Sequence, residues 1–170
     1  MKELVMKDLV MKDLVAIAEK IAAKLIERRQ TIAVAESSTG GLISAALLAV
    51  PGASAYYLGG AVVYTRDARR VLMEIPDEAM KGVRSASEPY AKMLAGQIRQ
   101  RFSSDWGLSE TGATGPTGNR YGDAAGHSCM GVAGVEASAM TLETGRPDRL
   151  ANMHLFASTA LNFLLQNLSR

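Results

Sequence analysis

Hydrophobic and polar positions repeat with two different periods along this chain. Apolar residues recur every three or four positions over residues 14–29 and 148–168, which is the spacing of helices that bury one face. Ser87 as an N-cap and Pro89 in the first turn predict a further helix over residues 88–102. Between these helices lie short runs of β-branched and small apolar residues, which are typical of buried strands. We expect strands at residues 31–35, 61–65, 106–111, 128–135 and 138–142, and shorter helices at 42–50, 66–73 and 77–82.

The order of these elements predicts the fold class. Helices alternate with the first three strands, whereas the last two strands follow one another as a hairpin. This order favours an α/β fold with helices on both faces of a mostly parallel five-stranded sheet that has at least one antiparallel strand. No shift in composition marks a second domain, so we expect one domain over residues 14–170.

The first fifteen residues repeat one five-residue unit three times, as MKELV, MKDLV and MKDLV. Five is not a helical period, so the apolar positions walk around a helix instead of forming one stripe. We expect residues 1–13 to form a frayed or partly helical extension. A membrane anchor is the weaker interpretation, because every unit carries one acid and one base. We expect a cytoplasmic protein without a membrane partner.

Composition excludes several classes of site. The chain has 170 residues with one cysteine and two histidines, which excludes a disulfide framework and a cysteine-rich zinc site. We expect neither a metal nor a cofactor. The 19 basic and 17 acidic residues give a net charge of +2 and are interspersed, so we expect no nucleic-acid partner.

Three segments rich in glycine and hydroxyl side chains stand beside predicted strands. They are residues 36–41, residues 51–54 with Gly59 and Gly60, and residues 111–118. In open α/β sheets, ligands bind where strands end and loops turn into helices. Glycine lets the backbone approach a ligand, and hydroxyls with free N–H groups suit an anion such as phosphate. Neither a P-loop nor a dinucleotide signature is present, and ordinary capped turns are the alternative.

The residues that could activate a hydroxyl nucleophile are few. His127 follows the third segment, and we leave open whether it lies at the surface or in a pocket. We expect His154 to lie in the core, on the apolar face of the last helix. We expect Cys129 to be a buried, unreactive thiol inside an apolar strand.

Taken together and in order, these segments resemble the CinA C-terminal domain family over residues 14–168. The best understood members are nicotinamide-nucleotide amidases, which hydrolyse the carboxamide of nicotinamide mononucleotide. The resemblance implies a three-layer α/β/α sandwich with a mixed five-stranded sheet and one antiparallel strand. It also implies a homo-oligomer and a small phosphorylated nucleotide as substrate or ligand. The matching motifs are residues 35–41, 50–54, 59–65, 87–88 and 112–118.

The resemblance also assigns roles to residues. The serine nucleophile of the family falls on Ser54, its assisting tyrosine on Tyr64, its catalytic lysine on Arg69, and the loop hydroxyl that supports the oxyanion on Thr111. The substrate-binding positions implied by the loops are Glu36, Ser37, Thr39, Gly40, Gly41, Gly60, Gly112 and Gly115.

Arg69 departs from the family pattern in a way that affects chemistry. A buried lysine can reach a pKa near neutrality, whereas a guanidinium stays protonated at pH 7 and is a poor general base. Two functions follow as hypotheses: a nicotinamide-nucleotide amidase in which another group such as Tyr64, His127 or Lys92 replaces the base, and a homologue that binds a nucleotide or phospho-ligand without hydrolysis. Milder departures are Ser38 in place of a cysteine and Asp123 near a usual lysine.

Overall fold

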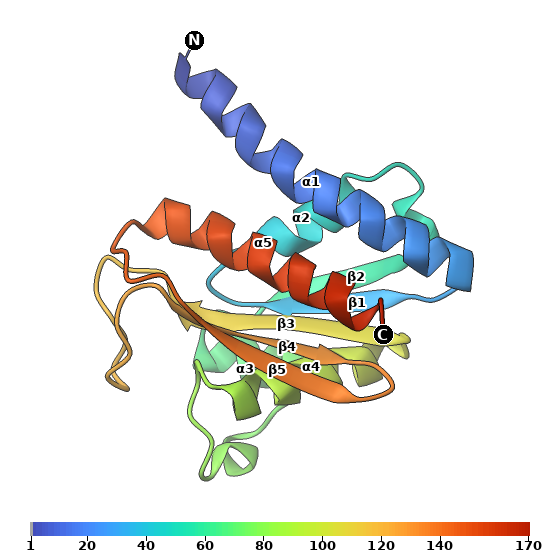
Figure 1. The fold of residues 1–170 in the computed structure, drawn as a ribbon. Helices are drawn as coiled ribbons and strands as arrows, with labels where there is room; N and C mark the ends of the chain where they lie inside the picture. The colour runs from blue at the N-terminus through green and yellow to red at the C-terminus, as the bar shows by residue number, and fades with distance from the viewer. Residues whose placement is uncertain (1) are drawn as a thin grey trace.

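A five-stranded sheet forms the centre of the molecule in the computed structural model, which describes residues 2–170, with side chains from residue 11 onward (Figure 1). The spatial order is β2-β1-β3-β4-β5. β1 is parallel to β2 and β3, whereas β4 is antiparallel to β3 and β5, so β4 is the one strand that runs against the others. The bounds are β1 Ile32–Glu36, β2 Tyr57–Val62, β3 Trp106–Ala113, β4 His127–Ala133 and β5 Ala137–Glu143.

Helices cover both faces of this sheet, which confirms the three-layer α/β/α sandwich. Figure 1 shows α1 (Lys2–Arg28), α2 (Leu42–Leu48) and α5 (Arg149–Asn167) above the sheet, and α3 (Arg66–Met73) and α4 (Glu88–Phe102) below it. The larger core lies under α1, α2 and α5, and a smaller core lies under α4. Burial of these apolar faces is the main force that holds the layers together.

The N-terminal repeat belongs to the backbone of a single helix. α1 is unbroken from Lys2 to Arg28. The first core side chain is Leu14, with Met11 packed against its cluster. The side chains of residues 1–10 lie outside the described part, so the expectation of a separate extension stays a prediction. None of the described helices is long and apolar enough to cross a membrane.

Capping residues define the ends of several helices, and these ends lie where the sequence predicts them. The Ser87 hydroxyl accepts from the Tyr90 amide at 3.4 Å and caps α4, and Asp148 caps α5 through the Ala151 amide at 3.0 Å. β2 differs from the expected 61–65 and ends at Val62, because Thr65 accepts from the Ala68 amide and caps α3.

Glycines let α4 lie directly on the sheet. A Cβ atom at Gly107 would overlap the carbonyl of Ala95, and one at Gly131 would overlap the carbonyl of Ala91. The Ser109 hydroxyl donates to that same Ala91 carbonyl at 2.6 Å. At Gly107 and Gly131 the backbone of α4 therefore contacts β3 and β4 directly.

Candidate functional site

The loop between β1 and α2 is organised by a buried carboxylate. Glu36 is fully buried at the end of β1 and accepts from the amides of Gly41, Ile43 and Ser44 at 2.9–3.1 Å. The Thr39 hydroxyl donates to it at 2.6 Å. These amides lie at the start of α2, where N–H groups have no partner within the helix and attract an anion. Glu36 thus supplies the negative charge that the N-terminus of α2 favours.

A second carboxyl group closes the same loop from β3. Glu110 is fully buried and accepts from the amides of Ser37 and Thr39 at 3.1 and 3.0 Å. The Ser38 hydroxyl at 2.5 Å and the Ser128 hydroxyl at 3.0 Å also donate to it. Burial raises the pKa of Glu110, and these hydrogen bonds oppose the rise only in part. Two carboxyl groups therefore occupy the loop that the sequence suggested for phosphate.

This arrangement corrects part of the predicted binding set. Glu36 and Thr39 form the internal network, Gly41 donates its amide to Glu36, and the Gly40 amide donates to the Ser37 carbonyl at 3.2 Å. None of these four residues lines the pocket described below. Residues 38–41 therefore form an ordinary capped turn, which was the alternative to a phosphate site. Among residues 36–41 only Ser37 faces the pocket.

A pocket of about 470 Å³ opens beyond the carboxyl ends of β1, β2 and β3. It brings together four of the predicted site residues, Ser37, Tyr64, Arg69 and Thr111. This volume lies within the range of small-molecule sites. The other lining residues are Val63, Thr65, Arg66, Asp77, Met80, Val83, Ser85, Tyr90, Asn119, Arg120 and Tyr121.

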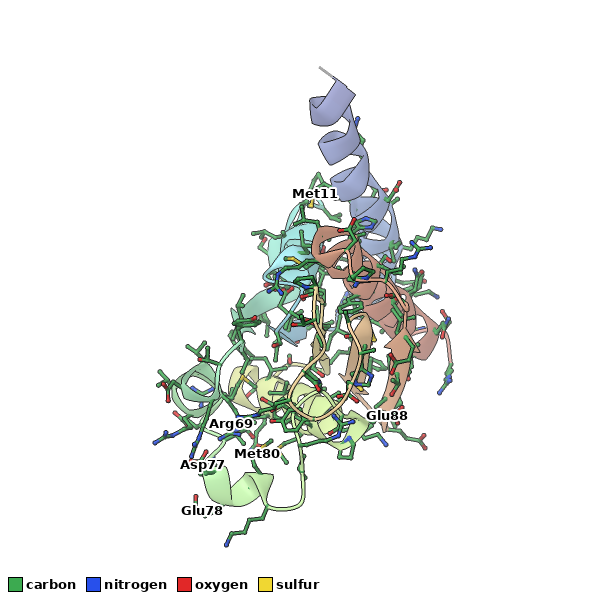
Figure 2. All side chains as sticks on the ribbon, turned by 90° about the vertical axis from the view of Figure 1, so that its left-hand side faces the viewer. Met11, Arg69, Asp77, Glu78, Met80 and Glu88 are labelled. Carbon is green, nitrogen blue, oxygen red and sulfur yellow. The ribbon has the colours of Figure 1, made fainter. Side chains whose placement is uncertain are left out.

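One end of the pocket holds two arginines and one aspartate. Arg69 is buried and pairs with Asp77, and its Nε donates to the Ile75 carbonyl at 3.3 Å. Arg66 pairs with the same carboxylate through Nε at 3.0 Å and through Nη2. The hydrogen bond from Arg66 lowers the pKa of Asp77 to about 2. Figure 2 shows Arg69 pointing toward Asp77, whereas Glu78 points outward.

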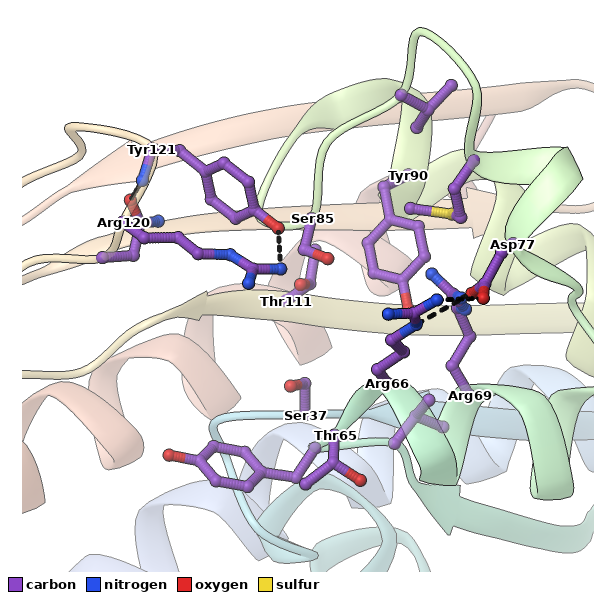
Figure 3. Close-up of a pocket in the computed structure, with 15 residues that line it drawn as sticks. Ser37, Thr65, Arg66, Arg69, Asp77, Ser85, Tyr90, Thr111, Arg120 and Tyr121 are labelled. Carbon is purple, nitrogen blue, oxygen red and sulfur yellow. Dashed lines mark hydrogen bonds and ion pairs between the residues drawn. The ribbon is translucent and has the colours of Figure 1, made fainter.

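The other end of the pocket holds an aromatic ring between cations. The Arg120 guanidinium lies 5.1 Å and that of Arg84 5.6 Å from the ring centre of Tyr121. Hydrogen bonding to Ser85 and to Arg120 lowers the pKa of Tyr121. Arg84 also forms an ion pair with Asp123, the residue near the family's usual lysine. Figure 3 shows Arg120 and Tyr121 at one end and Arg66, Arg69 and Asp77 at the other.

Hydroxyl groups lie between the two ends. The Thr111 hydroxyl is buried and accepts from the Ala86 amide at 3.3 Å. Tyr64 is exposed, and its hydroxyl accepts from Arg149 at 3.3 Å. Within the described residues the Ser37 amide and carbonyl are hydrogen-bonded, whereas its hydroxyl has no hydrogen-bond partner. Ser37 therefore offers a hydroxyl to a ligand in the pocket.

Ser54 does not join this group within one chain, which corrects the expected arrangement. It lies in the exposed turn Ala53–Ala55, before β2 begins, whereas Tyr64 and Arg69 follow the end of β2. The six residues of β2, each rising about 3.3 Å, separate the two positions along the sheet. Ser54 and Tyr64 of the same chain therefore cannot act on one bond.

The remaining predicted glycines shape the backbone and do not line the pocket. A Cβ at Gly60 would lie 2.7 Å from the Ser44 hydroxyl, and one at Gly112 would lie 2.6 Å from the His127 carbonyl. Gly115 has a φ of +107°, and its carbonyl accepts from Arg149 at 2.7 Å. These positions need glycine for close packing or for a left-handed conformation.

His127 is a buried tether and not a pocket residue, which corrects both sequence interpretations. Its Nδ1 pairs with Glu143, and its Nε2 lies 2.8 Å from the Ala86 carbonyl. Burial alone would lower its pKa, but Glu143, Ala86 and Asp123 together raise it. Cys129 is buried as predicted, and burial raises the pKa of its thiol. Lys92 is exposed on α4 and does not line the pocket.

The sequence motifs do not include the groups that give this pocket most of its charge. Arg66, Asp77, Arg120 and Tyr121 come from three separate segments, so no linear motif joins them. The Arg-Asp-Ala-Arg run at the start of α3 was the one available signal. Among residues with described side chains, no group of three or more His, Cys, Asp or Glu is placed to hold a metal ion.

Comparison with known proteins identifies relatives over almost the whole chain. The family model described as the CinA C-terminal domain matches residues 14–168. A CinA-like protein of Synechococcus sp. (strain CC9902) is 36% identical over 150 residues, covering 87% of this chain and 36% of the relative. A CinA-like protein of Chlorobaculum tepidum is 35% identical over 159 residues, covering 91% and 38%. The chain thus spans little more than a third of the length of these curated relatives.

Solved structures agree with the fold. The competence-damaged protein (CinA) superfamily protein from Enterobacter cloacae superimposes with a TM-score of 0.85 at 26% identity, covering 91% of this chain and 92% of that one. The competence/damage inducible protein from Agrobacterium tumefaciens gives 0.83 at 26% identity, covering 93% and 96%.

Proposed function

This chain belongs to the CinA C-terminal domain family, and we propose that it binds a small phosphorylated nucleotide of the nicotinamide mononucleotide kind in the pocket beyond β1, β2 and β3. The observation that carries the proposal is the charge of the lining, which contains three guanidinium groups, those of Arg66, Arg69 and Arg120, and one carboxylate, that of Asp77. Guanidinium groups bind phosphate oxygens through paired hydrogen bonds. The pocket is thus suited to an anionic ligand that also presents hydrogen-bonding groups to Ser37 and Thr111.

Hydrolysis of the carboxamide is the second candidate function. Ser37 favours it, because its hydroxyl faces the pocket without a hydrogen-bond partner in the described residues. Against it stands Arg69, which replaces the family's lysine, stays protonated at pH 7 and pairs with Asp77. A serine hydroxyl is a weak nucleophile unless a base takes its proton. We therefore place ligand binding first.

Thermal unfolding with nicotinamide mononucleotide tests the binding proposal. A ligand at 100 times its dissociation constant stabilises the folded state by about 2.7 kcal/mol. We expect a rise in Tm with the mononucleotide, a much smaller rise with the riboside that lacks phosphate, and loss of the difference in Arg66→Ala. The matched control is Arg70→Ala, which lies on the same helix but does not line the pocket.

Two results would contradict the proposal. Equal shifts with mononucleotide and riboside would mean that the arginines do not recognise phosphate. No shift with either compound would exclude the site. Release of ammonia above the level of a Ser37→Ala variant would support carboxamide hydrolysis over ligand binding alone.

A further inference from the structure

One wall of the pocket is formed by a segment without buried residues. Residues 76–85 lie between α3 and α4, and all of them are exposed or partly exposed, whereas Ile75 before them and Ala86 after them are buried. Figure 1 shows this segment as the green loop at the bottom of the molecule. The backbone hydrogen bonds of its short helical turn, at 3.0–3.2 Å, join residues of the segment to one another. A segment of this kind opens at a lower free-energy cost than the core.

Ion pairs and two apolar side chains hold the segment against the domain. Asp77 pairs with the two arginines of α3, and Arg84 pairs with Asp123 at 3.0 Å near the other end. Met80 and Val83 pack against the smaller core but are only partly buried. The pairs of Asp77 are therefore the charged contacts that keep the α3 end of the segment on the pocket.

The Asp77 carboxylate occupies the positions where an anionic ligand would bind. Its Oδ1 accepts from Arg66 Nε at 3.0 Å and also from Arg69 Nη2, while its Oδ2 accepts from Arg66 Nη2. The side chain is 36% exposed, so a ligand can reach it, unlike the fully buried carboxylate of Glu36. A phosphate monoester carries close to two negative charges and three acceptor oxygens, so it brings more charge and one more oxygen to the same two guanidinium groups.

We propose that Asp77 is an internal competitor for the phosphate of the ligand, and that residues 76–85 form a flap that leaves the two arginines when phosphate replaces the carboxylate. This inference rests on the proposed function, because it requires a phosphorylated ligand at Arg66 and Arg69. The competition weakens every ligand that binds there through phosphate by the same factor, which is set by the fraction of molecules in which the flap is open. A compound without phosphate does not displace the flap.

Calorimetric titration tests the competition with two probes, nicotinamide mononucleotide and inorganic phosphate. Asp77→Asn should bind both about tenfold more tightly, which corresponds to a flap that is open in about 10% of the unaltered molecules. The matched control is Glu78→Gln, which removes the same charge from the next residue, whose side chain points outward (Figure 2). It should bind both probes as the unaltered chain does. Circular dichroism checks that each variant is folded.

Proteolysis of the unaltered chain tests the movement of the flap and needs no variant. Lys81 is exposed and is the one lysine of residues 76–85. With a protease that cuts after lysine, saturating mononucleotide should speed cleavage after Lys81 by up to about tenfold, because cleavage follows the population of the open form. Asp77→Asn should be cut at the faster rate without ligand. Cleavage after Lys92, inside α4, should stay slow in every sample and controls for global unfolding.

Different failures overturn different statements. If the unaltered chain binds the mononucleotide and Asp77→Asn binds it no more tightly, the inference is wrong and the proposed function stands. The same holds if Glu78→Gln gains as much affinity as Asp77→Asn, or if the mononucleotide protects Lys81, because the flap would then close over the ligand with Asp77 in place. If none of these proteins binds the mononucleotide or phosphate, both the proposed function and the inference are wrong.

Discussion

The Asp77 carboxylate lies between two guanidinium groups, those of Arg66 and Arg69. It neutralises one of them and fixes the direction of the buried Arg69 side chain. A lysine placed at position 69 would face the same carboxylate, and a neighbouring negative charge favours the protonated ammonium. The absence of a general base at position 69 therefore depends on Asp77 as well as on Arg69.

This pair gives a prediction about catalysis. We expect Arg69→Lys alone to release no more ammonia from nicotinamide mononucleotide than the unaltered chain. In Arg69→Lys/Asp77→Asn the lysine loses its partner inside a partly buried site, so its neutral form becomes accessible near neutral pH. An ammonia assay across pH 6–9 should show activity in the double variant and not in the single variant. Activity of the single variant that equals that of the double variant would contradict the role given to Asp77.

Elements were predictable from sequence where their signals are local. α4 was placed at residues 88–102 because Ser87 caps it and Pro89 fits its first turn. β2 was placed too late along the chain, because its glycines and exposed side chains lack the pattern of a buried strand. The loop at residues 36–41 was interpreted as a phosphate site, since sequence alone does not show that Glu110 of another strand fills it.

The start of β4 and the end of β5 are joined to the loop before α4 through His127, which contacts Glu143 and the Ala86 carbonyl. Since the folded state raises the pKa of His127, the stability gained from the tether is fully present below the unfolded value of about 6.5 and is lost as pH rises through the folded value.

We expect His127→Gln to reduce the free energy of unfolding more at pH 5.5 than at pH 9. Urea unfolding of both proteins at the two pH values measures this difference. Glu143→Gln should weaken the same pH dependence, because it removes the carboxylate that pairs with the imidazolium. An equal loss at both pH values would mean that the contact is stabilising only through packing.

For the molecule as a whole, the three layers were predictable from sequence, but the close distance between α4 and the sheet was not. Apolar periodicity and the family resemblance gave helices on both faces and one antiparallel strand. The direct contact of α4 with the sheet depends on Gly107 and Gly131, whose role appears only once both elements are assembled. The pocket was predictable only in part. Ser37, Tyr64, Arg69 and Thr111 lie at or after the ends of strands, whereas Asp77 and Tyr121 reach the pocket from distant loops.

The close contact between α4 and the sheet predicts opposite effects on stability for two similar substitutions. Gly131→Ala forces a methyl group against the α4 backbone and should destabilise the protein by about 1–3 kcal/mol. Gly96→Ala lies within α4 with no atom within 4 Å of the added methyl, and it should stabilise by about 0.5–1 kcal/mol through helix propensity. Urea unfolding compares them, and equal effects of the two substitutions would contradict the close contact.

Glu36 and Glu110 have a consequence that reaches beyond the loop they close. An anion that is part of the chain acts at a local concentration that no change in the solution can dilute. Dissolved phosphate cannot compete for those amides, so the start of α2 is insensitive to the cell's supply of phosphate. In the proposed function, recognition of an anionic ligand then falls to pocket side chains such as Arg66 and Arg120.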